Sequence, residues 1–121
     1  MFLKPLIQHF LLLFCCFFGV VLYGQHKEDI IKLHNEFGQI CFVNFDKATT
    51  NAKKAVILSE KIADKNLSLN SYKNLSEILY LTKENDSSAY VYNEKAISLA
   101  LETKRNNELA SLYNLSGSIA K

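Results

Sequence analysis

The sequence predicts an all-α fold built from five short helices, and three observations support this prediction. After residue 24 the chain contains no Pro and only two glycines, Gly38 and Gly117, so strong turn formers are scarce. Good helix formers such as Ala, Leu, Lys and Glu are frequent there. Apolar residues recur at spacings of three and four, the period of a helix with one buried face, and no stretch alternates long enough for a strand.

Polar segments separate the five expected helices. The segment "NFD" ends the first helix, and Asp46 within it is a preferred residue for the N-cap of the second. Asp86 or Ser87 is expected to cap the fourth helix in the same way. The helices are expected at residues 27–42, 47–63, 67–82, 88–103 and from 108 onward.

The predicted helices repeat in two alternating kinds. "ATTNAKKAVIL", which begins at Ala48, and "AYVYNEKAISL", which begins at Ala89, share Ala, Lys-Ala and Leu at matching positions. The other three helices align through "HNEFGQIC", "YKNLSEIL" and "LYNLSGSI", at spacings of about 40 residues. The order is therefore A-B-A-B-A, where A and B name the two kinds of helix. Small residues at the shared positions let neighbouring helices approach closely.

This pattern resembles the tetratricopeptide repeat (TPR) family over residues 27–121. The family's A-helix pattern of a large residue, a small residue and a later apolar residue is similar to Phe37-Gly38-Cys41, Leu75-Ser76-Leu79 and Leu115-Ser116-Ile119. The B-helix pattern resembles Ala89, Tyr92 and Glu94-Lys95-Ala96-Ile97, with Ala48, Ala52 and Ala55 as a sparser version.

The resemblance implies TPR-like helical hairpin repeats that form a short right-handed solenoid. Residues 25–121 would hold about two and a half repeats, either as the whole repeat domain or as the N-terminal part of a longer array or sensor protein. The sequence departs from the family in its period of about 40 residues, against about 34. The extra length is assigned to the segment between each B-helix and the next A-helix, and the closing Pro is absent.

The resemblance also implies a non-catalytic scaffold that binds a protein or peptide on the surface formed by the A-helices. Positions that flank the buried A-helix motif would face this groove: Asn35, Gln39, Lys73, Glu77, Tyr80, Tyr113 and Asn114. For any one of them the alternative is an ordinary solvated helix face. For the whole chain the alternative is a small secreted helical bundle that self-associates through its broadly apolar C-terminal helix.

Residues 1–24 have the organisation of a secretory signal peptide. Lys4 supplies a positive start, a mostly apolar run follows over residues 6–22, and Gly24 is a small residue before polar chain. The uninterrupted apolar part, residues 10–22, is shorter than the roughly 20 residues that span a bilayer. We therefore expect export to the periplasm or the exterior with cleavage after Gly24. The alternative is an N-terminal membrane anchor, in which case the membrane would be a partner.

Composition and motifs argue against several other functions. After residue 24 the chain has 13 basic and 12 acidic residues, which gives no electrostatic reason to expect nucleic acid. His26 and His34 lie outside any cluster of metal ligands, and no phosphate loop or nucleophile motif is present. The sequence therefore predicts neither an enzyme nor a site for a metal or cofactor. Cys41 is expected as a small buried apolar residue, and His34 as a residue at the core edge.

Overall fold

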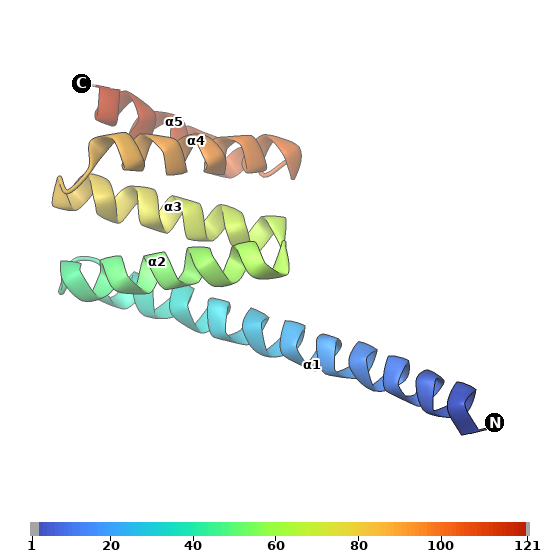
Figure 1. The fold of residues 1–121 in the computed structure, drawn as a ribbon. Coiled ribbons are helices and arrows are strands. Elements are labelled where there is room, and N and C mark those ends of the chain that lie inside the picture. Colours follow the sequence, from blue (N-terminus) through green and yellow to red (C-terminus); the bar gives the residue numbers. More distant parts are fainter. Residues whose placement is uncertain (1–2, 121) are drawn as a thin grey trace.

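The structure, a computed structural model, describes residues 3–120, and this part of the chain is five helices without a strand. Successive helices lie side by side and run in opposite directions, so that the chain forms one stack from its first helix to its last (Figure 1). The prediction of an all-α fold is confirmed. The helices are α1 (Leu3–Ile40), α2 (Phe45–Ile62), α3 (Lys65–Thr82), α4 (Asp86–Glu102) and α5 (Asn106–Ala120).

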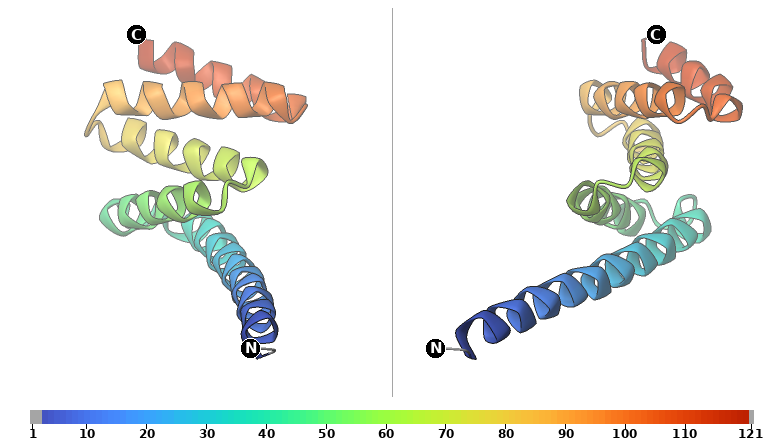
Figure 2. Two further views of the ribbon diagram at one scale, coloured as in Figure 1. Left: turned by 45° about the vertical axis from the view of Figure 1, so that its right-hand side comes forward. Right: turned by 90° about the vertical axis from the view of Figure 1, so that its right-hand side faces the viewer.

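The first helix begins much earlier than the sequence suggested. The expected start near Lys27 was wrong, because α1 continues back to Leu3 without a break. Neither Pro nor any run of turn formers lies between the apolar segment and Lys27, so nothing stops the helix there. The N-terminal half of α1 projects away from the other helices (Figure 2), and all side chains from residue 12 to residue 25 are exposed. None of the helices within residues 3–120 carries an apolar stretch that could cross a membrane.

Asparagine side chains cap α2 and α4, which corrects the expected caps. The Asn44 side chain accepts a hydrogen bond from the Lys47 amide at 3.1 Å, and Asn85 accepts one from the Ser88 amide at 3.0 Å. Asp46 and Asp86 lie in the first turns of these helices. There the carboxylates face the positive end of the helix dipole, which explains their presence without a capping role.

The turns recur with the same spacing in the sequence as Ala48 and Ala89. The two Asn caps are separated by this spacing, and so are the starts of α2 and α4 and the starts of α3 and α5. Ala63 and Lys104, again one such spacing apart, both adopt left-handed backbone conformations, with φ of 53° and 60°. Only Ala63 and Asp64 separate α2 from α3, which have 18 residues each. The segment after α2 therefore holds no extra length, and the expectation that placed it there was wrong.

The third helix holds the stack together. Each helix packs on the next one along the chain, and α3 also packs on α1 and α5, whereas no Cα atom of α2 lies within 8 Å of one in α4. The core lies at these interfaces, where the small residues of the repeated pattern are fully buried: Ala48, Ala52, Ala89 and Ala96. The packing role expected for these alanines is confirmed. Phe37, Cys41 and Leu75 share one apolar cluster with Ala48, Ala52 and Ala89, and Ala96 lies in a second cluster with Leu69 and Leu112.

Candidate functional site

Three of the seven predicted groove residues line one open groove between α3 and α5. Lys73 and Glu77 contribute from α3 and Asn114 contributes from α5. The groove has a volume of about 410 Å³, and its other lining residues are Ser111, Leu112, Leu115 and Ser118. We call it the α3–α5 groove. Its walls combine hydroxyl, amide and charged groups with two leucines, a composition that is able to hold a short peptide.

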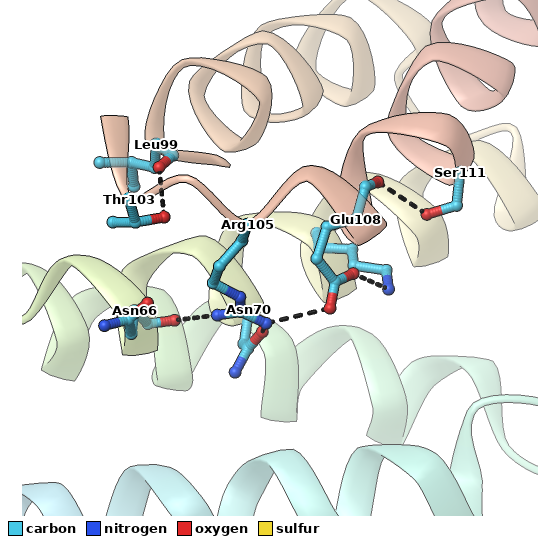
Figure 3. Close-up of polar contacts among 8 residues, drawn as sticks. Asn66, Asn70, Leu99, Thr103, Arg105, Glu108 and Ser111 are labelled. Carbon is cyan, nitrogen blue, oxygen red and sulfur yellow. Dashed lines mark hydrogen bonds and ion pairs between the residues drawn. The ribbon is translucent and has the colours of Figure 1, made fainter. Parts of the chain in front are cut away.

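An ion-pair network already engages Lys73. The Lys73 ammonium lies 2.8 Å from Glu108, and the Arg105 guanidinium lies 3.0 Å from the same carboxylate. Arg105 also donates to the Asn70 side chain at 3.0 Å, so that it ties the α4–α5 turn to α3 (Figure 3). The hydrogen bond from Lys73 is the main reason that the pKa of Glu108 is lowered. Lys73 therefore fixes α5 on α3, and Glu77 remains as the carboxylate of the groove.

The other four predicted residues do not join this groove. Asn35 and Gln39 line a separate shallow hollow of about 380 Å³ whose walls come from α1 alone. Tyr80 is half-buried and packs against the apolar core, and the Lys83 ammonium lies 4.2 Å from its ring centroid. Tyr113 is 52% exposed and lines none of these hollows.

Sequence reasoning missed a chain of buried polar groups that links α1, α2 and α3. His34 Nε2 lies 2.8 Å from Ser71 Oγ, which lies 2.6 Å from Ser59 Oγ. Ser59 donates to the Ala55 carbonyl at 2.6 Å. With the Nε2–H tautomer of His34, Nε2–H donates to Ser71 and Ser71 donates to Ser59, so each of these groups has a partner. Ser59 lies on the same face of α2 as Ala48 and Ala52, at helical spacings of four and seven, and this spacing was the signal in the sequence that Ser59 is buried.

This polar chain is part of the packing between the helices. Ser59 and Ser71 are fully buried, so neither hydroxyl can meet a substrate. Burial lowers the pKa of His34, which keeps the imidazole neutral at the core edge, where it was expected. These hydrogen bonds connect α1, α2 and α3 at one point.

A second missed residue is Asn93 on α4, which is fully buried against α5. Its side-chain amide donates to the Leu112 carbonyl at 2.7 Å and to Ser116 Oγ at 2.6 Å. Its Oδ1 atom is buried without a hydrogen-bond partner. Asn93 falls on the same helical stripe as Ala89, Ala96 and Ala100, and that spacing was the signal for its burial.

The potential metal ligands are scattered over the described part of the chain. Within residues 3–120, no three side chains of His, Cys, Asp or Glu gather closely enough to hold a metal ion. Cys41 is buried, as expected, whereas Cys15 and Cys16 are exposed on the projecting part of α1.

The chain matches no protein-family model, no curated protein and no solved structure.

Proposed function

We propose that the chain is a TPR-like repeat scaffold that binds a protein or peptide without catalysing a reaction. The recurrence of caps, left-handed turns and helix starts at one common spacing supports a repeat. The contacts of α3 with α1 and α5, together with the separation of α2 from α4, support a short right-handed solenoid of helical hairpins in the order A-B-A-B-A. In such an array the A-helices α1, α3 and α5 form the binding surface.

The observation that carries the binding proposal is the α3–α5 groove between two A-helices. Within the described residues, Glu77 takes part in no ion pair, since Lys73 is neutralised by Glu108. Ser111, Asn114 and Ser118 add groups that donate and accept hydrogen bonds along the same groove. An extended peptide with a donor or cationic group opposite Glu77 fits this arrangement.

Selection of peptides displayed on phage, with the full chain as bait, tests the proposal. Peptides that enrich are then measured against the wild type, Glu77→Lys and a matched control, Lys61→Glu, which reverses an exposed charge on α2. We expect Glu77→Lys to weaken binding about 10-fold or more, since it replaces attraction by repulsion, and Lys61→Glu to leave binding unchanged. Failure to enrich any peptide, or equal binding by both variants, would contradict the proposal.

Self-association is the second candidate function, and the exposure of α5 favours it. Leu112 is the only buried side chain of α5 within residues 106–120, while Tyr113 is half exposed. Sedimentation of the full chain over a range of concentrations separates the two candidates. A mass that stays at one chain at all concentrations would exclude a self-associating module.

The proposed location is outside the cytoplasm, with residues 1–24 as a signal peptide. The first half of α1 projects from the helical stack and is exposed, so the stack does not depend on it for packing, which is consistent with this proposal. Mass spectrometry of the protein from its native host tests cleavage: a mature N-terminus at Gln25 is expected. A chain that retains residues 1–24 would favour the anchor.

A further inference from the structure

A second groove lies on another side of α3, between α2 and α4. The backbones of these two helices stay more than 8 Å apart between Cα atoms, and α3 forms the floor between them. Two adjoining hollows of about 480 and 560 Å³ occupy this gap, and Glu60 lines both. We call their union the α2–α4 groove. It follows α3 from Ser68 to Leu79, a distance of about 17 Å at ~1.5 Å per helical residue.

A pair of stacked tyrosines stands where the two hollows meet. Tyr72 lines one hollow and Tyr92 lines the other, and their ring centroids are 6.0 Å apart at an angle of 25°. The Tyr72 hydroxyl donates to Glu60 at 2.9 Å. Burial and this hydrogen bond raise the pKa of Tyr72 to about 12, so the phenol stays neutral. The pair is therefore a fixed aromatic surface with a carboxylate at its edge.

The chain's own Lys95 shows that this aromatic surface attracts a cation. Its ammonium lies 5.5 Å from the Tyr72 centroid and 5.4 Å from the Tyr92 centroid. Within residues 3–120, neither Lys95 nor Glu60 takes part in an ion pair. Lys95 is exposed and sits on a flexible stem, so a better cation can displace it at low cost.

Apolar groups lie next to this cation site in the same groove. Ile57 on α2 is 55% exposed, and Val56 and Leu79 lie beside it in the hollow that Tyr92 lines. Glu84 at the far end adds a second carboxylate without an ion-pair partner among the described residues. The length of the groove matches about five residues of extended chain at ~3.3 Å each.

We propose that the α2–α4 groove binds a partner segment in which an arginine is flanked by an aliphatic residue. The guanidinium stacks on Tyr72 and Tyr92 in place of Lys95 and donates to the Glu60 carboxylate. The aliphatic side chain packs on Ile57. Guanidinium suits this site better than ammonium, because it is planar and can stack and donate to a carboxylate at the same time. This surface is additional to the α3–α5 groove, and different residues test it, so either proposal can fail alone.

A titration followed by nuclear magnetic resonance tests the proposal on the full chain. The probe is a capped five-residue peptide with arginine at its centre and leucine on each side, and the matched probe carries neutral citrulline instead. We expect saturable shifts at the Tyr72 and Tyr92 rings and the Ile57 methyl groups, and binding about 5-fold weaker for citrulline. Equal binding of the two peptides, or no saturable shift, would overturn the proposal.

Three variants make the test specific. Glu60→Gln is expected to weaken binding of the arginine peptide about 5-fold, whereas Lys95→Met is expected to strengthen it about 3-fold by clearing the rings. Asp29→Asn, which removes an exposed carboxylate on α1 outside both grooves, is the control and leaves binding unchanged. A merely structural Lys95 would not improve binding on removal, so unchanged or weaker binding by Lys95→Met refutes the displacement of Lys95 by arginine.

Discussion

Substitution of Asn93 by leucine is expected to leave the stability of the chain nearly unchanged, although the residue is fully buried and makes two short hydrogen bonds. Loss of two neutral hydrogen bonds costs about 2 kcal/mol, at about 1 kcal/mol each. Removal of the unpartnered Oδ1 atom returns roughly 1–3 kcal/mol of desolvation. Ser116 keeps a contact with Glu94 at 3.3 Å. The expected change in the free energy of unfolding of Asn93→Leu is therefore within about 1 kcal/mol of zero.

Two further variants at the same position make this reasoning refutable. Asn93→Asp is expected to destabilise the chain by about 3 kcal/mol or more, because a buried carboxylate cannot donate to the Leu112 carbonyl. Asn93→Ala loses the hydrogen bonds and leaves a cavity, so it should fall between the other two. Urea unfolding followed by circular dichroism at the helix band measures all three free energies. A loss above about 2 kcal/mol for leucine would refute the assignment of Oδ1 as unpartnered, and an aspartate variant as stable as the wild type would refute the role of the hydrogen bond to Leu112.

Three other predictions follow from the packing and the charges. The lowered pKa of Glu108 means that its contribution to stability is complete above pH 4.5 and is lost as the pH falls through the folded pKa. Urea unfolding at several pH values should therefore show a smaller loss of stability in acid for Glu108→Gln than for the wild type. The lowered pKa of His34 means that the unfolded chain takes up a proton first, so stability should fall as the pH drops below 6.5 towards the folded pKa. A His34→Gln variant with the same loss of stability would contradict the assignment of this loss to His34. Leu69→Ala should cost about 2–5 kcal/mol, because Leu69 is fully buried between α3 and α4, whereas Leu101→Ala, at a side chain 54% exposed, should change the unfolding free energy by less than about 0.5 kcal/mol.

The helices and their buried faces could be predicted because they depend on local spacing. Ala48 and Ala89 occupy equivalent positions in the repeated pattern, and both are fully buried. The caps could not be decided in the same way, since Asn44 and Asp46 are both good cap residues and lie two positions apart. Which of them caps α2 depends on where the chain turns after α1, and that is set by packing.

The candidate site was harder to predict, because it depends on register between distant helices. Lys73 and Glu108 are 35 residues apart, and nothing local in the sequence shows that α5 brings them together. The pairing of Tyr72 with Tyr92 depends in the same way on the packing of α4 on α3. Spacing within one helix identifies a face, but it does not identify the side chain that will lie opposite.

The contacts of α3 with all four other helices set the order in which the molecule can come apart. Opening at either end detaches α5, or the part of α1 that packs on α2 and α3, while the remaining helices stay packed, as expected for a linear array. Separation of α3 itself removes a partner from every other helix at once, so this event coincides with global unfolding. Backbone amides in the middle of α3 should therefore exchange with solvent most slowly, and protection should decline towards both ends of the stack. A partner that bound α3 and α5 together would oppose opening at the C-terminal end of the stack.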